Sequence, residues 1–185
     1  INAAVMAFTQ PGESVIIQPP VYLPFFSAVT QTGRKLIQNP PHLENGRYTI
    51  DFDHLVQCAK NAQLLLLCSP HNPVGRVWQP AELERLLQIA EQHDLTIFSD
   101  EIHADLIYPG NRHHTLAAFS GNSAKIITAV APSKTFNIPG LNLSALIIPD
   151  KSIRTPITQV FNNFHTSASN PFSITAFETA YREGE

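Results

Sequence analysis

Short, continuous apolar runs alternate along the chain with segments whose apolar residues recur every three or four positions. The continuous runs are rich in Leu, Ile and Val, which is typical of strands buried on both faces, whereas the second pattern indicates helices that bury one face. We predict strands at 14–18, 34–38, 64–68, 95–99, 125–130 and 143–148. We predict helices at 1–10, 21–32, 52–61 and 81–93, and mainly helix from 152 onward with an interruption around 167–171.

Turn-forming and capping residues separate these elements. Gly33 closes the second predicted helix, because glycine readily takes up the left-handed conformation with which helices often end. Asp51 is placed to cap the third helix, and Pro80 stands in the first turn of the fourth. Between the second and third predicted helices, beyond a strand, we predict a loop that runs through Pro40 and Gly46.

Strands that alternate with helices at this spacing predict crossover connections and an α/β fold. We expect a mostly parallel sheet with helices on both faces, which is a three-layer α/β/α arrangement. We assign residues 1–150 to this unit and residues 151–185 to a helical segment that follows it.

Composition and charge narrow the class of function. The chain has 185 residues, of which 43% are hydrophobic and 15% charged, so an ordinary globular core is expected. Its net charge is −3 and no basic stripe is present, which argues against a nucleic-acid partner. No apolar run approaches the length that crosses a membrane. Cys58 and Cys68 lie in apolar segments without metal-ligand spacing, which favours reduced thiols in a cytoplasmic protein.

Three predicted strands are each followed by a polar residue of a different chemical kind, namely Asn72, Asp100 and Lys134. The carboxyl ends of parallel strands meet at one edge of the sheet, where α/β proteins bind their ligands. A partly desolvated lysine amine at that edge can attack a carbonyl group. Together, an amine, a carboxylate and an amide meet the needs of pyridoxal phosphate: an amine for its aldehyde, an anion for its ring nitrogen and a donor for its phenolic oxygen.

Each residue also has a purely structural interpretation. Lys134 matches a surface lysine in a loop, and Asn72 matches a turn residue between two prolines. Asp100-Glu101 is consistent with a helix N-cap, and Tyr22 with a core aromatic. We interpret His113-His114 as part of a loop rather than a metal site, because no third ligand has fitting spacing.

Four motifs, in this order along the chain, resemble those of the fold-type I pyridoxal-phosphate enzymes, the class I/II aminotransferase superfamily. They are Pro20-Val-Tyr22, His71-Asn-Pro-Val-Gly75, Ser99-Asp-Glu-Ile-His103 and Ser133-Lys-Thr-Phe-Asn-Ile-Pro-Gly140. The resemblance covers essentially the whole chain and implies the large, cofactor-binding domain of such an enzyme.

The resemblance implies a role for each matching residue. Lys134 corresponds to the lysine that forms the Schiff base, Asp100 to the partner of the pyridine nitrogen and Asn72 to the donor to the phenolic oxygen. Tyr22 corresponds to the aromatic residue that stacks on the ring. His103 occupies the position where many aminotransferases carry a tyrosine that contacts the phenolic oxygen; it is either the same donor or a satisfied core residue.

Two positions depart from the aminotransferase pattern. The family commonly has a serine three residues before the lysine and an arginine eight residues after it, both of which hold the phosphate. Here these positions are Ala131 and Asn142. We therefore expect Ser133, Asn142 and backbone amides to contact the phosphate, together with groups that precede Ile1.

Two longer phrases, His71–Trp78 and Asp100–Leu106, look like the carbon–sulfur β-lyase branch of the superfamily, the cystathionine β-lyase type. This branch implies cleavage of cystathionine or another S-substituted cysteine to a thiol, pyruvate and ammonia. A transaminase uses all the same residues and stays open as an alternative, as does a catalytically silent homologue. The resemblance also implies a homodimer, a truncated N-terminus and a small C-terminal domain beyond this chain.

Overall fold

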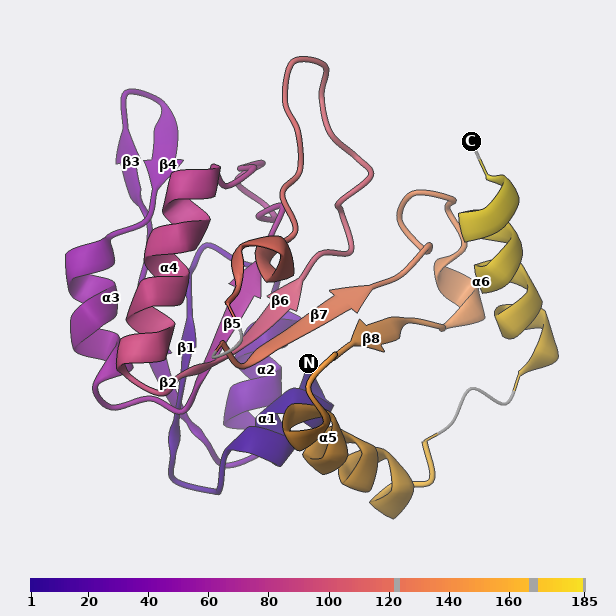
Figure 1. Ribbon diagram of the computed structural model, residues 1–185, viewed down its shortest axis with the longest axis horizontal. Helices are drawn as coiled ribbons and strands as arrows, with labels where there is room; N and C mark the ends of the chain where they lie inside the picture. Colours follow the sequence, from indigo (N-terminus) through magenta and orange to yellow (C-terminus); the bar gives the residue numbers. More distant parts are fainter. Residues whose placement is uncertain (122–123, 167–169, 185) are drawn as a thin grey trace.

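The computed structural model describes residues 1–121, 124–166 and 170–184 and contains a central sheet of six strands in the order β2-β1-β5-β6-β7-β8 (Figure 1). All neighbouring pairs are parallel except β7 and β8, which are antiparallel. The strands are β1 (Ser14–Ile17), β2 (Lys35–Gln38), β5 (Leu64–Cys68), β6 (Thr96–Asp100), β7 (Ile126–Val130) and β8 (Ala145–Ile147). The predicted, mostly parallel sheet is confirmed, and each of these strands lies within or next to its predicted range.

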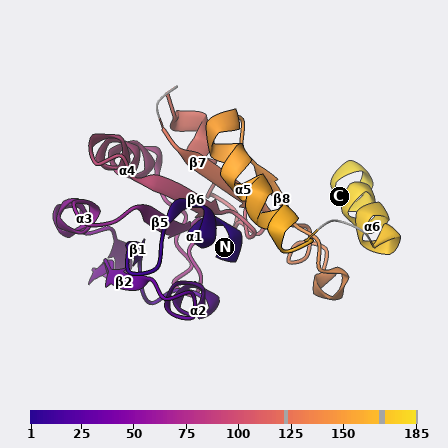
Figure 2. The same ribbon diagram turned by 90° about the horizontal axis from the view of Figure 1, so that it is seen from below.

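Helices cover both faces of the sheet, which confirms the three-layer arrangement (Figure 2). One face carries α3 (Phe52–Ala59) and α4 (Pro80–Gln92), and the other carries α1 (Asn2–Phe8), α2 (Pro24–Thr30) and α5 (Lys151–Asn163). Two short 3-10 helices, η1 (Leu116–Phe119) and η2 (Pro139–Leu141), lie in connections, and α6 (Pro171–Glu183) ends the described chain.

The central strand β5 shows why its sequence is apolar at every position. Leu64 and Leu66 pack into the core under α1, α2 and α5, whereas Leu65 and Leu67 pack into the core under α3 and α4. All four side chains are fully buried. Successive residues of a strand point to opposite faces, so a strand between two helical layers needs apolar residues throughout.

The helix ends follow the capping signals. The Asp51 carboxylate accepts a hydrogen bond from the His54 backbone N–H at 2.9 Å and begins α3 as predicted. Pro80 is the first residue of α4, where its missing N–H costs no helical hydrogen bond. The second predicted helix begins at Pro24 rather than at 21, and therefore leaves Tyr22 in the preceding turn.

The predicted loop around Pro40 and Gly46 is wrong in part, because it contains a hairpin. Strands β3 (His42–Glu44) and β4 (Arg47–Thr49) pair antiparallel outside the main sheet. Asn45 and Gly46 form the turn between them with φ of 49° and 76°. Asn-Gly is a strongly favoured pair for such a two-residue turn, because both residues tolerate positive φ.

The C-terminal helices pack in different places. Ile153 and Ile157 of α5 are buried in the core that also contains α1 and α2. In contrast, α6 lies away from the sheet, where the Ser173 hydroxyl donates to the Leu141 carbonyl of η2 (Figure 1). The predicted interruption around 167–171 falls mostly outside the described residues. Within the described ranges, every helix is too short or too polar to cross a membrane.

Leu66→Ala tests the central packing. The fully buried side chain leaves a cavity in the middle of the sheet, so we expect the substitution to lower the free energy of unfolding by about 2–5 kcal/mol in urea denaturation. Leu43→Ala is the control, because Leu43 is 61% exposed on the hairpin and should change stability by less than about 0.5 kcal/mol. Equal effects of the two substitutions would contradict this description of the core.

Candidate active site

The three polar residues predicted to meet lie at the carboxyl ends of three adjacent strands. In the sheet register Cys68 of β5 pairs with Asp100 of β6, and Asp100 pairs with Ala129 of β7. Asn72 follows β5 by four residues and Lys134 follows β7 by four, so both leave the same edge of the sheet as Asp100. The parallel pairing thus gathers residues that are far apart in the sequence.

Asp100 is the last residue of β6 and is largely enclosed. One oxygen of its carboxylate accepts a hydrogen bond from the Ile102 backbone N–H at 3.3 Å. Burial raises the pKa of the Asp100 carboxyl above its ordinary value, because desolvation disfavours the charged form. A turn rather than a helix follows Asp100, so the alternative of a helix N-cap is wrong.

His103 lies within electrostatic range of both other charged groups. Burial lowers the pKa of the His103 imidazole, the Asp100 charge raises it, and the Lys134 charge lowers it. Its Nδ1 atom is buried and has no hydrogen-bond partner within the described ranges. The imidazole is therefore not a satisfied core residue, and it keeps a polar atom for a ligand.

Lys134 stands on an exposed turn of defined shape. The Phe136 N–H donates to the Pro132 carbonyl at 2.9 Å, and the Ile138 N–H donates to the Ser133 carbonyl at 3.1 Å. These backbone bonds fix the turn, whereas the lysine amine makes no hydrogen bond or ion pair to the part of the chain that the structure describes. The side chain is thus available to a ligand at the sheet edge.

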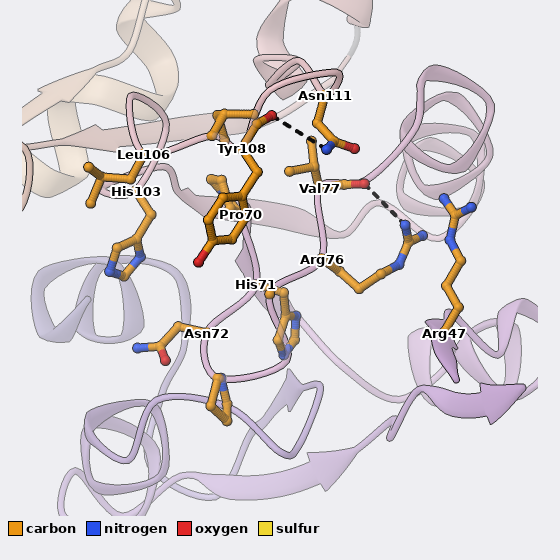
Figure 3. Close-up of a pocket in the computed structure, with 13 residues that line it drawn as sticks. Arg47, Pro70, His71, Asn72, Arg76, Val77, His103, Leu106, Tyr108 and Asn111 are labelled. Atoms are coloured by element: carbon orange, nitrogen blue, oxygen red, sulfur yellow. Dashed lines mark hydrogen bonds between the residues drawn. The ribbon is translucent and has the colours of Figure 1, made fainter. Parts of the chain in front are cut away.

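Asn72 and His103 both line a cavity of about 420 Å³ that opens beside the sheet edge (Figure 3). Asn72 belongs to a tight turn, in which the Gly75 N–H donates to the His71 carbonyl at 2.8 Å. Its own backbone N–H donates to the Cys68 sulfur at 3.3 Å. The turn interpretation and the ligand interpretation of Asn72 are therefore compatible, because the turn directs the amide into the cavity.

Tyr22, Ser133 and Asn142 are not among the residues that line this cavity. Tyr22 is 46% exposed, so the alternative of a core aromatic is wrong. Ser133 is half-buried on the Lys134 turn. Asn142 has a left-handed backbone with φ of 48°, and its amide donates to the Gly140 carbonyl at 3.4 Å, so its recorded contact is within its own turn.

Sequence interpretation missed a buried network beside Asp100. The Glu101 carboxylate is 3% exposed and accepts hydrogen bonds from the Ser99 hydroxyl at 2.9 Å, the His113 Nε2 at 2.8 Å and the Leu116 backbone N–H at 3.1 Å. It ties the sheet edge to the far end of the long loop after β6, which projects at the top of Figure 1. The apolar surroundings of Leu116 are the only signal in the sequence that this segment returns to the core.

Among the residues that the structure describes, no three His, Cys, Asp or Glu side chains are grouped to hold an ion. The two cysteines are buried and free, and burial raises the pKa of the Cys68 thiol to about 12, which keeps it protonated.

A lysine, a buried carboxylate and an amide beyond the carboxyl ends of parallel strands are the groups that pyridoxal phosphate needs. The family model described as "Aminotransferase class I and II" matches residues 1–180, so the chain belongs to this family. Pyridoxal 5'-phosphate is the cofactor of the family.

The similar proteins include cystathionine beta-lyases and aminotransferases. The chain is 42% identical over 187 residues to cystathionine beta-lyase PatB of Bacillus subtilis, covering 100% of this chain and 48% of that protein. It is 33% identical to cystathionine beta-lyase of Corynebacterium glutamicum, covering 100% of this chain and 49% of that protein. The crystal structure of cystalysin from Treponema denticola, which contains a pyridoxal 5'-phosphate cofactor, superposes with a TM-score of 0.95 at 43% identity over 98% of this chain and 47% of that one. The chain therefore spans about half the length of the curated relatives it matches.

Glu101→Gln tests the buried network. The amide keeps the shape of the side chain but loses the charge and places an N–H₂ group against donors, so we expect a loss of about 3 kcal/mol in the free energy of unfolding. Glu178→Gln is the control, because its pair with Arg182 is exposed on one helix and contributes about 0.5 kcal/mol or less. A similar small loss for both substitutions would show that Glu101 does not hold the loop.

Asp100→Asn tests the electrostatic cost of the site in cofactor-free protein. Because burial raises the folded-state pKa of Asp100, its stabilising contribution is present at low pH and is lost as pH rises through that pKa. Asparagine carries no charge to desolvate. We therefore expect the variant to gain stability relative to the parent as pH rises above about 4 in thermal denaturation. A difference that does not change with pH would contradict the burial argument.

Proposed function

We propose that the complete natural protein is a pyridoxal-phosphate-dependent carbon–sulfur β-lyase. It cleaves cystathionine or another S-substituted cysteine to a thiol, pyruvate and ammonia. The observation that carries the proposal is the meeting of Asn72, Asp100 and Lys134 at the carboxyl ends of β5, β6 and β7. Similarity to two cystathionine β-lyases over the whole chain supports the branch.

The residues present fit the cofactor. The Asp100 carboxylate, raised in pKa by burial, gains a cationic partner when it faces a protonated ring nitrogen. His103 and Asn72 offer polar groups for the phenolic oxygen, Tyr22 offers an aromatic face, and the unpaired amine of Lys134 meets the aldehyde. Ser133 and Asn142 are the proposed phosphate contacts from this chain. When bound, the cofactor supplies an electron sink for the bonds of the substrate's α-carbon.

The remaining chemistry belongs to the protein. The amine of Lys134, once exchanged for the substrate's amino group, removes the α-proton as a general base. With the cofactor bound, the Asp100 carboxylate would keep the ring nitrogen in its protonated, positive form, which is the form that accepts electrons from the α-carbon. Loss of the thiolate from the β-carbon breaks the carbon–sulfur bond, and water converts the remaining three-carbon unit to pyruvate and ammonia.

Transamination is the second candidate. The description of the matching family names aminotransferases, and transamination needs the same residues. The two reactions differ after the proton leaves the α-carbon: a lyase expels the thiolate from the β-carbon, whereas a transaminase keeps the carbon–sulfur bond and transfers the amino group. We further propose a cytoplasmic homodimer in which residues 1–150 form the cofactor-binding unit and residues 151–185 a helical extension. The first helix of that extension, α5, packs on the unit through Ile153 and Ile157.

Lys134→Ala tests the cofactor assignment. The purified parent protein should show visible absorption from the cofactor, and borohydride should fix the cofactor to Lys134. The variant should lose the covalent attachment and at least about 10³-fold in rate, because it lacks both nucleophile and base. Lys60→Ala, an exposed lysine paired with Gln57 at the end of α3, should leave both properties unchanged. An unaltered spectrum in the Lys134 variant would contradict the assignment.

Incubation with cystathionine separates the candidate reactions. A lyase releases pyruvate and a thiol in the absence of any keto-acid acceptor, whereas a transaminase stops after one turnover without an acceptor. We expect continuous pyruvate release, measured by coupling to lactate dehydrogenase. Turnover that requires a keto acid favours the transaminase, and protein that binds no cofactor is the catalytically silent homologue.

A further inference from the structure

The cavity lined by Asn72 and His103 extends from these residues to the β3–β4 hairpin. Figure 3 shows these two side chains on one side of the cavity and Arg47, from strand β4 of the hairpin, on the other. Leu106, Ile107 and other residues of the long loop after β6 also line the cavity, and Leu106 lies beside His103 in Figure 3. A ligand whose reacting end is held at Asn72 and His103 therefore extends toward Arg47.

The Arg47 guanidinium is the charge that the protein leaves unpaired there. Arg47 is exposed, and within the described ranges its side chain has neither a hydrogen bond nor an ion pair. Arg76, the other arginine of the cavity lining, is buried and donates to both oxygens of Glu82 at 2.5 and 2.7 Å. Its charge is therefore neutralised, whereas that of Arg47 is not.

Arg76 also holds the hairpin that carries Arg47. Its Nε donates to the Tyr48 carbonyl at 2.6 Å, and its guanidinium lies 4.7 Å from the centre of the Trp78 ring. Trp78 is itself fixed, because its Nε1 donates to the Cys68 carbonyl at 3.0 Å and its side chain is 1% exposed. The backbone next to Arg47 is thus anchored to β5 through buried groups, which places Arg47 at a defined position.

The rest of the lining favours an anion. Among the described residues that line the cavity, none is Asp or Glu. Burial lowers the pKa of both lining histidines, His71 and His103, so both are neutral near pH 7. Tyr108 and Asn111 add uncharged polar groups. The cavity therefore has a positive end at Arg47 and uncharged walls, a combination that attracts carboxylates.

We propose that Arg47 binds a carboxylate on the sulfur substituent of the substrate. The site would then prefer S-substituted cysteines whose leaving thiol carries a carboxylate group. This inference rests on the proposed lyase function and adds a substrate class to it. The contact is made by the part of the substrate that does not react, so it sets binding more than the rate of the chemical step.

Two matched substrates test the proposal on the complete natural protein. S-(2-carboxyethyl)cysteine and S-(2-carbamoylethyl)cysteine have the same shape and differ in one charge. We expect the parent protein to prefer the acid in kcat/KM, and Arg47→Gln to raise KM for the acid about tenfold with little change in kcat. The same variant should change KM for the amide less than about twofold. Arg85→Gln, which alters an exposed arginine that pairs with Asp53 on α3, should change neither.

Other outcomes overturn the proposal. Equal loss for both substrates would mean that Arg47 binds the α-carboxylate, and a weaker affinity for pyridoxal phosphate would mean that it binds the phosphate. No change for either substrate would make it a surface arginine. If the parent protein releases no thiol from either compound, the lyase proposal fails by itself. Calorimetric binding of the two compounds to parent and variant then decides the role of Arg47, with the same tenfold preference expected.

Discussion

The parallel pairing of β5, β6 and β7 is the constraint on which the site depends. Because these strands run in the same direction and in register, their carboxyl ends stop at one line across the sheet. A residue just beyond the end of β6 is then flanked by residues that follow β5 and β7, although 27 residues separate β5 from β6 and 25 separate β6 from β7. An antiparallel neighbour would deliver its exit to the opposite edge, as β8 does. The backbone hydrogen bonds between the strands therefore set the positions of these residues, independently of contacts between their side chains.

This arrangement places polar groups where the protein does not satisfy them. The Asp100 carboxyl is enclosed with its pKa raised by burial, and His103 keeps a buried nitrogen without a partner within the described ranges. Both features cost stability in the absence of a ligand and are relieved by a ligand with a cationic nitrogen and an acceptor or donor oxygen. Residues arranged to bind a ligand often lower the stability of the ligand-free protein.

Buried pairs of polar side chains next to the site hold the surrounding segments in place. Glu101 with His113 fixes the loop after β6, and Arg76 with Glu82 fixes the hairpin to the turn that follows β5. Arg76 and Glu82 bond to each other, and the Glu101 carboxylate accepts three hydrogen bonds from the protein, whereas the side chains of Lys134 and Arg47 have no hydrogen-bond or ion-pair partner within the described residues. The distinction between paired and unpaired charges separates the scaffold from the site more clearly than burial does.

Much of this could be predicted from the sequence. The buried strands, the helix caps at Asp51 and Pro80 and the polar residues after three strands are local signals, and parallel topology converts them into one site. The β3–β4 hairpin was not predicted, although Asn45-Gly46 is a strong signal for a hairpin turn. The nearby prolines favoured a loop instead. The pair of Glu101 and His113 has no local signal, because it depends on how a long loop returns to the core.

The roles of Ser133 and Asn142 show the same limit. Their assignment to the phosphate rests on resemblance, and the local contacts of Asn142 are confined to its own turn. Phosphate binding depends on backbone amides and on groups brought from elsewhere in a folded chain, which a linear motif does not encode. By contrast, the positions of Asn72, Asp100 and Lys134 follow from strand order alone.

A crystal structure of the complete natural protein with pyridoxal 5'-phosphate tests the central claim most directly. The account predicts one cofactor ring bonded to Lys134 through its aldehyde carbon, with the Asp100 carboxylate roughly 2.6–3.2 Å from the pyridine nitrogen and the Asn72 amide at the phenolic oxygen. A ring attached to another lysine, or one whose nitrogen lies out of hydrogen-bond reach of Asp100, would contradict it.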